Sequence, residues 1–302
     1  MNRNCAMSRI EHYASRLAPN VAPINAIFIA RHFNRVFGRR PRPPQDPEAD
    51  YHDFLVDRMS RGGWSSTQLR CVDKEFAKLE ASKLHPAIKA AETVAVIPIR
   101  GMSIDRFTEA MGPHLGRHFV AKPTHGSAAT EFLDARPDLT KLYRAGRYNY
   151  FYSFRESQYA PLERKIIIEE NIAEHGSDLR DFKFFCSFGR ILFVQVDANR
   201  FIEHERILLS PPDFEPLNLT LGAFKPTTTW VRPKQFEALC HAAQDLSRPF
   251  DFVRVDLYEQ AGQVFFGEFT FTPGAGMEPF SEPGFSRRLL SEIKARPDCP
   301  AR

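Results

Sequence analysis

The segment FVRVDLYEQAGQVFFGEFTF, at residues 252–271, constrains the fold most, because it holds two alternating polar and apolar runs around a short break at Gly262. Side chains of a β-strand alternate between the two faces of a sheet, so the pattern predicts two strands joined as a hairpin. The period of two places Arg254 and Asp256 on one face, and hairpin pairing brings Glu268 nearly opposite Asp256. The sequence therefore predicts an antiparallel sheet with two carboxylates close together.

Two carboxylates held this close repel each other, which raises the pKa of one of them unless a cation lies between them. Mg²⁺ is the natural candidate, because it takes a few carboxylate oxygens, keeps waters and completes its shell with nucleotide phosphates. Arg254, on the same face, would add a positive charge directed at phosphate oxygens. From the hairpin alone an exposed face with a simple pair between Arg254 and Asp256 remains an equal alternative.

The remaining pattern predicts an α+β protein. The 302 residues suffice for one large core or two coupled ones. The strongest break, GRRPRPPQDPEAD at residues 38–50, contains four prolines and predicts a linker after a basic, amphipathic N-terminal helix. Helical patterns follow at 51–60 and 72–92, and further helices are predicted at 233–248, opened by Pro233, and at 284–295. Strand-like runs lie between them, at 93–99, 118–123, 164–170, 182–197, 252–259 and 263–271.

This layout leads us to expect three regions. Residues 1–50 would form an N-terminal helical segment with a Pro-rich linker, and residues 51–117 a mostly helical subdomain. Residues 118–302 would form a third region, which contains most of the strand-like runs. Hairpins interspersed with helices argue against a strictly alternating parallel βαβ sheet.

Charge and cysteine content restrict the class of partner. A net charge of +4 from 41 basic and 37 acidic residues gives no footprint for nucleic-acid binding, but it leaves anionic small molecules open. The five cysteines contain no CxxC pair, so we expect neither a disulfide framework nor a zinc site, and we expect a reducing cytoplasm. No apolar run reaches the roughly 20 residues of a membrane span. The basic N-terminal segment leaves peripheral membrane association open, and the oligomeric state is open too.

A candidate phosphate-binding element lies at FVAKPTHGSAAT, residues 119–130. Lys122 ends a predicted strand and would supply a point charge for phosphate, and the loop of His125, Gly126 and Ser127 would let backbone amides approach an anion. A solvated lysine at a strand end is the ordinary alternative. The chain lacks GxxxxGK[ST] and GxGxxG, which disfavours P-loop and Rossmann nucleotide binding.

Three further groups of polar residues follow predicted strands. The strand KIIIEENI ends in Glu169, Glu170 and Asn171, which could offer acceptors to an adenine amine and a ribose, unless it is merely a solvated strand end. Arg200 could grip a phosphate or a carboxylate, and we prefer it to His204 because a lone histidine is more often structural. Period two places Asp181 and Lys183 on one face, either toward a nucleotide or as a simple surface pair.

In order and spacing these motifs resemble the ATP-grasp superfamily, and most closely its TupA-like branch of bacterial surface-polysaccharide biosynthesis. The matching motifs, between about residues 119 and 280, are AKPTHGS, IIIEENI, DFKFF, VQVDANRF, FVRVDLYE and GEFTFTPGAGM. The resemblance implies an ATP-grasp fold, in which two α+β subdomains hold ATP between them, preceded here by a helical N-terminal extension.

The resemblance also implies roles for individual residues. Lys122 would hold ATP phosphates, Glu169, Glu170, Asn171 and Ile172 would line the adenine hinge, and Asp181, beside Lys183, would face the ribose. Arg254 would contact the transferred phosphate, with Asp256 and Glu268 binding Mg²⁺. Where the family has an Asn as third metal ligand, this chain has Thr270, whose hydroxyl or a bound water would take its place.

The chemistry implied by the resemblance is ATP-dependent ligation of a carboxylate to an amine through an acyl phosphate, in capsular or related polysaccharide biosynthesis. The substrates would be small-molecule or glycan carboxylates and amines. Two other classes stay open: a small-molecule kinase that stops after phosphoryl transfer, and a non-catalytic module that binds nucleotide or polysaccharide. Amine-dependent phosphate release would distinguish a ligase from a kinase, and absence of turnover would indicate a binding module.

Overall fold

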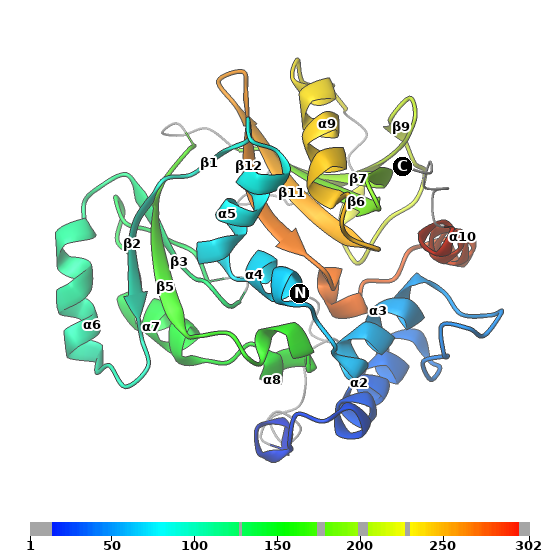
Figure 1. Cartoon of the computed structure of the whole chain (residues 1–302), viewed down its shortest axis with the longest axis horizontal. Coiled ribbons are helices and arrows are strands. Elements are labelled where there is room, and N and C mark those ends of the chain that lie inside the picture. The colour runs from blue at the N-terminus through cyan, green and yellow to red at the C-terminus, as the bar shows by residue number, and fades with distance from the viewer. Residues whose placement is uncertain (1–13, 127–128, 174–178, 199–204, 227–229, 296–302) are drawn as a thin grey trace.

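The computed structural model describes residues 14–126, 129–173, 179–198, 205–226 and 230–295. Within these ranges the strands form two separate sheets, one large and one small, which lie on opposite sides of the molecule in Figure 1. The helices are α2 (Ala22–Phe37), α3 (Tyr51–Arg61), α4 (Ser66–Val72), α5 (Lys74–Leu84), α6 (Ile104–Met111), α7 (Leu139–Arg147), α8 (Phe151–Phe154), α9 (Phe236–Ser247) and α10 (Pro283–Lys294). The mixture of helices with largely antiparallel sheets confirms the α+β class.

The large sheet is built around antiparallel strands. It contains β1 (Lys89–Ala90), β6 (Asp181–Ser187), β7 (Arg190–Ala198), β8 (Glu205–Ser210), β9 (Glu215–Pro216), β10 (Lys225–Pro226), β11 (Val253–Gln260) and β12 (Gln263–Thr270). Its order is β1-β12-β11-β6-β7-β8-β10, with β9 also paired to β8. Only the short strands β1 and β10 run parallel to their neighbours in the described residues, so the sheet is not of the βαβ type.

The predicted hairpin of β11 and β12 is present. Its two-residue turn, Ala261 and Gly262, has positive φ angles of 51° and 73°, which match the twist of the flanking strands. Asp256 is the direct register partner of Glu268, as the alternation predicts. The hairpin therefore places both carboxylates side by side on one face.

One face of the large sheet is covered by α4, α5 and α9. Alternate residues of the central strands, such as Phe184 and Val255, are buried there against Ala77 of α5 and Leu239 of α9. Helix α9 begins at Phe236, so the expectation that a proline opens it is wrong: Pro233 lies before the helix and accepts a hydrogen bond from the Phe236 amide.

The opposite face of the large sheet is covered only over part of its area. Phe185 of β6 and Phe193 of β7 are buried there, with Leu55 of α3 and Leu289 of α10 in the same cluster. Farther along the same strands, charged side chains replace the phenylalanines, beginning with Lys183 on β6. The polar part of the sheet therefore starts where the covering helices end.

The small sheet has the same division between an apolar and a charged face. Its strands, β2 (Thr93–Pro98), β3 (Phe119–Pro123), β4 (Glu131–Phe132) and β5 (Lys165–Glu170), pair in the order β2-β5-β3-β4. Ala121 and Ile168 belong to a core that also includes Phe107 of α6 and Leu142 of α7. The neighbouring residues Lys122 and Glu169 alternate onto the opposite face, where they form an ion pair.

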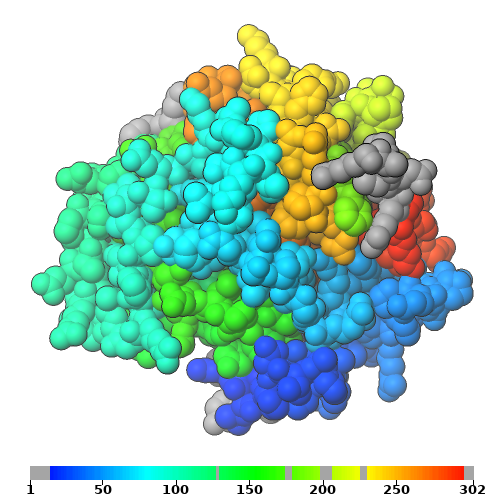
Figure 2. Space-filling view, viewed as in Figure 1, coloured from blue at the N-terminus to red at the C-terminus, as the bar shows by residue number. Residues whose placement is uncertain are grey.

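Helices α4 and α5 lie between the two sheets. Figure 2 shows their cyan segment across the middle of the molecule, between the teal small-sheet region and the orange and yellow large-sheet region. Helix α5 begins at Lys74, whose amide donates to the Thr124 carbonyl after β3, while the same helix packs on β12. The side chains of α5 can therefore reach both charged faces.

The N-terminal helix α2 confirms the expected helical extension. The Pro-rich stretch after it has no helix or strand, and it is fixed by Arg39, which bonds Asp53 at 2.8 Å and Asp50 at 2.8 Å. Asp50 caps α3 in a capping box with Asp53. None of the helices in the described part of the chain combines the length and apolarity required to cross a bilayer.

A bulge fixes the hairpin register. Asp256 pairs with Glu268 but Leu257 pairs with Phe266, which leaves Gly267 as the extra residue on β12. A β-carbon at position 267 would lie 2.7 Å from Cε2 of Tyr258 and 3.0 Å from the Asp256 carbonyl oxygen. Only glycine fits here without moving the ring or the strand.

We therefore expect Gly267→Ala to lower the free energy of unfolding by about 1–3 kcal/mol, because the overpacked strand must shift. Urea denaturation followed by circular dichroism measures this loss. Gly112→Ala is the matched control, because a β-carbon there meets nothing within 4 Å. Equal stability of the two variants would contradict the proposed constraint.

Candidate active site

Charged side chains form a row across the polar part of the large sheet. Glu268 of β12 is in register with Asp256 of β11, Asp256 with Lys183 of β6, and Lys183 with Gln195 of β7. Residues in direct register across antiparallel strands present their side chains on the same face at close distance. The sheet thus sets two carboxylates and a lysine next to one another.

Arg254 binds both carboxylates of the hairpin. Its Nε and Nη2 donate to Asp256 at 2.6 and 2.7 Å, and Nη2 also lies 3.2 Å from Glu268 Oε1 and 3.0 Å from Thr270 Oγ1. The nearby carboxylates outweigh burial and raise the pKa of Arg254 further. A cation therefore does lie between Asp256 and Glu268 in this structure, and it is the guanidinium group.

Lys74 of α5 supplies a second positive charge to Glu268. Its Nζ lies 3.2 Å from Glu268 Oε2 and donates to the Gly126 carbonyl at 2.8 Å. Burial alone would raise the pKa of Glu268, but Lys74, Arg254 and Lys183 together lower it to about 2. Glu268 therefore stays ionised, and Lys74 links it to the loop that follows β3.

A second charged row lies beside the first. Asp181 of β6 is in register with Asp197 of β7, and Asp197 with Arg206 of β8. Lys183 forms an ion pair with Asp181 and also lies 3.4 Å from Asp256. Arg206 bonds Asp197 at 3.0 Å. The predicted pairing of Asp181 with Lys183 is therefore present, within a buried network that reaches Asp256.

The charged face of the small sheet carries the predicted lysine. Lys122 Nζ lies 2.5 Å from Glu169 Oε2, and Lys78 of α5 pairs with Oε1 of the same carboxylate. Although burial would raise the pKa of Glu169, the two lysines lower it. Burial lowers the pKa of Lys78 despite this pairing. The carboxylate of Glu169 thus pairs with two lysines, one from α5 and one from β3, and the group keeps a net positive charge.

The loop after β3 lies within the described residues only in part. His125 is buried and its Nε2 lies 3.0 Å from the Tyr148 carbonyl, while burial lowers the pKa of its imidazole. Gly126 provides the carbonyl that Lys74 binds. Ser127 lies outside the described residues, as do Arg200 and His204.

The expected adenine hinge follows an interior strand. β5 pairs with β2 on one side and β3 on the other, so its backbone up to Glu170 is engaged by neighbours. The Asn171 amide donates to the His118 carbonyl, and its side-chain oxygen accepts from the Ala173 amide. Glu170 is exposed, and Asn171 and Ile172 are half-buried, so their side chains remain reachable.

The sequence interpretation missed Lys74 and Lys78. They lie one helical turn apart on α5, in the segment VDKEFAKLE, and each pairs with a carboxylate that the sequence did assign to the site. Their i and i+4 spacing is visible in the sequence and predicts a common helix face. Spacing alone could not show that this face is turned toward the two sheets.

The donor set fits a hard divalent cation. Asp256 and Glu268 both approach one nitrogen of Arg254, at 2.7 and 3.2 Å, so the two carboxylates already converge on a single positive position with Thr270 beside it. Mg²⁺ is commonly held by one or two carboxylates with waters and phosphates completing its shell. Among the described residues no cluster of three or more His, Cys, Asp or Glu side chains could form a dedicated metal cage.

A buried carboxylate lies beneath the turn that follows β12. Glu156 accepts a hydrogen bond of 2.6 Å from Thr272 Oγ1, directly before the turn η4 (Pro273–Gly276), and one of 3.4 Å from Gln158. Burial raises the pKa of Glu156 to about 7, although the hydrogen bonds oppose the rise. Its charge therefore changes near neutral pH.

The raised pKa makes stability depend on pH. Folding favours the protonated form, so the free energy of unfolding should fall by roughly 3 kcal/mol as pH rises from about 4.5 to 7, and then level off. Glu156→Gln should remove this fall, since its amide stays neutral. Urea denaturation across this pH range measures both proteins, and identical pH profiles would contradict the assignment.

Comparison with known proteins places these motifs in a family. The model of the TupA-like ATPgrasp family matches residues 103–294, well over half of the chain. No curated protein matches the sequence significantly.

Solved structures of similar shape include three ligases. The D-alanine–D-alanine ligase from Bacillus anthracis complexed with ATP is 13% identical, with 68% of this chain and 55% of that chain covered and a TM-score of 0.37. VanG D-Ala:D-Ser ligase from Enterococcus faecalis is 14% identical over 80% and 66%, with a TM-score of 0.43. The L-amino acid ligase from Bacillus licheniformis is 11% identical over 76% and 50%, with a TM-score of 0.41.

Proposed function

Because the chain belongs to the TupA-like ATP-grasp family, we propose that it is an ATP-dependent carboxylate–amine ligase that works through an acyl phosphate. The observation that carries the proposal is the convergence of Arg254, Asp256 and Glu268 on one face of the large sheet. Lys74 of α5 joins this group at Glu268, and Lys78 of the same helix shares Glu169 with Lys122 of the small sheet. Such a site combines carboxylates for a metal with cations for phosphates.

The lysines would neutralise the phosphates of ATP. Lys74, Lys78 and Lys122 each now pair with a carboxylate, Glu268 or Glu169, and their ammonium groups are only partly exposed. An incoming polyphosphate would offer them stronger acceptors, because charge-assisted bonds to phosphate are strong in a site of low dielectric. The small sheet and α5 would thereby close on the nucleotide.

Asp256 and Glu268, with the Thr270 hydroxyl, would hold Mg²⁺ when it is bound with ATP. Mg²⁺ supplies charge neutralisation on the transferred phosphoryl group and orients it for attack. Arg254 would then direct its planar guanidinium at the same phosphate, since it lies beside both carboxylates. Arg200, outside the described residues, remains a proposed further contact for phosphate or substrate.

The proposed reaction has two steps. A substrate carboxylate oxygen attacks the γ-phosphorus of ATP, so that an acyl phosphate forms and ADP leaves. An amine then attacks the acyl carbon, and inorganic phosphate leaves with the former carboxylate oxygen. Positioning and charge neutralisation by Lys122 and Arg254 would carry both steps, so a nucleophilic side chain is not needed.

The rest of the nucleotide would lie along the expected hinge. The side chains at the end of β5 and just after it are accessible: Glu170, Asn171 and Ile172. We propose that they line the adenine together with Glu169. Asp181, next to Lys183, would face the ribose. His125, Gly126 and Ser127 would form the loop over the phosphates.

The biological setting is also a proposal. By resemblance the amide would be formed in bacterial capsular or other surface polysaccharide, from small-molecule or glycan substrates. A reducing cytoplasm, which also supplies ATP, agrees with the free, buried thiols of Cys71, Cys186 and Cys240. Burial raises the pKa of each of these thiols to about 12, so they are unreactive at neutral pH.

The test is incubation with Mg²⁺ and ATP, with pooled amino acid amides as amines and pooled N-acetylamino acids and uronic acids as carboxylates. Mass spectrometry should find an amide together with ADP, and ADP release should require both pools. A phosphorylated substrate that accumulates without amine would indicate a kinase. Nucleotide binding without any turnover would indicate a binding module.

We expect Lys122→Ala to weaken ATP binding by about 10- to 100-fold while it changes adenosine binding little, because only ATP carries the charge that the ammonium meets. Calorimetric titration with each ligand measures the difference. Lys89→Ala is the control, because Lys89 is exposed on β1 and its Nζ donates to the side-chain oxygen of Gln263. Equal weakening of ATP and adenosine would point to a packing role for Lys122.

A further inference from the structure

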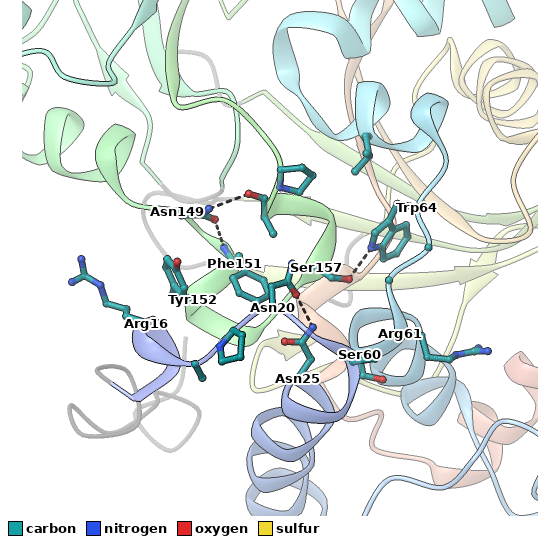
Figure 3. A pocket seen from close by; sticks show the side chains of 18 of the residues that line it. Arg16, Asn20, Asn25, Ser60, Arg61, Trp64, Asn149, Phe151, Tyr152 and Ser157 are labelled. Carbon is teal, nitrogen blue, oxygen red and sulfur yellow. Dashed lines mark hydrogen bonds between the residues drawn. The ribbon is translucent and has the colours of Figure 1, made fainter.

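A cavity of about 770 Å³ lies away from the charged cluster, where three segments of the chain meet. Its walls come from residues 16–25, from residues 60–64 at the end of α3 and just after it, and from residues 149–161 around α8 and η3 (Ser157–Tyr159), with Leu69 of α4 beside them. Figure 3 shows these three segments around the cavity, with side chains from each of them directed toward the others. The cavity is large enough for a small organic ligand.

The polar groups of the cavity are neutral and incompletely paired. Asn25 is 2% exposed, and its Nδ2 donates to Asn20 Oδ1 at 2.8 Å. Its own Oδ1 is buried and has no hydrogen-bond partner in the described part of the chain. A buried acceptor without a donor is destabilising, so a ligand that donates a hydrogen bond here would be stabilised. Ser157 Oγ accepts from Trp64 Nε1 at 2.8 Å and keeps its own hydrogen to donate.

Charged groups lie only at the rim. Arg16 and Arg61 are the charged residues that line the cavity, and Figure 3 shows both guanidinium groups directed outward, at opposite edges. Arg61 is paired with Asp57. No carboxylate, lysine or histidine belongs to the described lining. A charged ligand would therefore lose its hydration without gaining an ionic partner, which disfavours it strongly.

Aromatic side chains complete the walls. Trp64, Phe151 and Tyr152 line the cavity, and the first and last of these are only partly buried. The aromatic faces offer apolar contact to a ligand, and the amide and hydroxyl groups beside them offer hydrogen-bond donors and acceptors. Hydroxyl groups of a ligand can both donate and accept, which matches the unpaired Asn25 oxygen and the Ser157 hydrogen.

The cavity wall is held in place by a buried arginine. Arg155, which is fully buried, donates from Nη1 to the carbonyls of Ser15 and Ala18 at 3.1 and 3.2 Å, and from Nη2 to that of Pro19 at 3.0 Å. Its guanidinium also lies over the rings of Phe28 and Phe151. Arg155 thus ties the N-terminal segment to the end of α8. The cavity therefore needs little rearrangement to bind a ligand.

We propose that this cavity is a binding site for a neutral, hydroxyl-rich molecule of the size of a saccharide unit. The inference is independent of the ligase reaction, because it concerns binding in the absence of nucleotide. Its position also connects it to the site: Glu156, which bonds Thr272 before the turn η4, directly precedes the cavity residue Ser157.

The test measures ligand binding through the fluorescence of Trp64, which lines the cavity. The chain has two tryptophans, so the full-length Trp230→Phe protein keeps Trp64 as its only tryptophan, whose emission is excited selectively over that of tyrosine. The probes are methyl glycosides of glucose, galactose, mannose, rhamnose and N-acetylglucosamine, with glucuronate and glutamate as charged competitors. At least one neutral glycoside should change the emission saturably below about 50 mM, and both charged probes should bind about tenfold more weakly.

Substitutions locate the binding. Asn20→Ala and Asn25→Leu should each raise the Kd by about tenfold, whereas Asn34→Ala, an exposed position of α2 outside the cavity, should not. If Asn25→Leu does not fold, the test rests on the Kd of Asn20→Ala, because Asn20 is exposed. The proposal is overturned if no neutral glycoside saturates, if a charged probe binds as tightly, or if Asn20→Ala leaves the Kd unchanged. ATP affinity, measured separately, tests the ligase proposal and does not bear on this one.

Discussion

Glu268→Gln is expected to lower magnesium-dependent ATP turnover by at least about a hundredfold, because the variant loses a carboxylate at the position where a metal would neutralise the phosphates. In the present structure Glu268 is ionised, with a pKa of about 2, and it binds Arg254 and Lys74. Glutamine has the same shape and keeps one acceptor oxygen, which can accept from Arg254 or from Lys74, so the fold should persist. Steady-state ADP release with purified protein measures the effect.

The control for this variant is Glu259→Gln, on β11 of the same hairpin. Glu259 pairs in register with Val264 and lies away from the charged rows. Its replacement should leave ATP turnover within about twofold of the original, since surface substitutions away from such features have small effects. Unchanged turnover in Glu268→Gln, with unchanged dependence on Mg²⁺, would remove the proposed metal site.

Arg254→Lys is expected to lower kcat about 30- to 1,000-fold, with a smaller rise in the KM for ATP. This corresponds to about 2–4 kcal/mol, the scale expected when one preorganised donor to the transition state is lost. Lysine keeps the charge but loses the fork that now binds Asp256 with two nitrogens and reaches Glu268 and Thr270. Full steady-state kinetics separate the two parameters.

Arg190→Lys is the matched control, because Arg190 lies on β7 of the same sheet but is exposed and binds carbonyls near α10. Its kinetics should be unchanged. A normal kcat for Arg254→Lys would refute its contact with the transferred phosphate. A larger change in KM than in kcat would assign it to ground-state binding instead.

The hairpin could be predicted in detail because a period of two fixes which side chains share a face. Asp256 pairs in register with Glu268, and Arg254 lies on the same face as Asp256. The alternation predicts both. The family match confirms the TupA-like ATP-grasp fold that the order of the motifs implied. The bulge at Gly267 was not predicted, because it depends on the packing of Tyr258 across the hairpin.

The contacts between the sheets could not be predicted, because they depend on tertiary packing. The sequence shows Lys74 and Lys78 on one helix face, but only the burial of Ala77 and Ala81, on the same side of α5, holds this face against the large sheet, where the lysines reach Glu268 and Glu169. The pair between Arg254 and Asp256, by contrast, lies within the hairpin and was one of the alternatives left open by the alternation. The metal role of Thr270 and the hinge role of Ile172 stay predictions.

The most direct test of the ligase mechanism follows oxygen from the carboxylate substrate. The substrate pool is labelled with ¹⁸O in its carboxyl groups and incubated with the protein, Mg²⁺, ATP and the amine pool, and the released inorganic phosphate is analysed by mass spectrometry. An acyl phosphate intermediate predicts one ¹⁸O atom in each phosphate released by amide formation, and none without protein or with Glu268→Gln. Unlabelled phosphate, or ADP formed with the phosphoryl group retained on a substrate hydroxyl, would contradict the account.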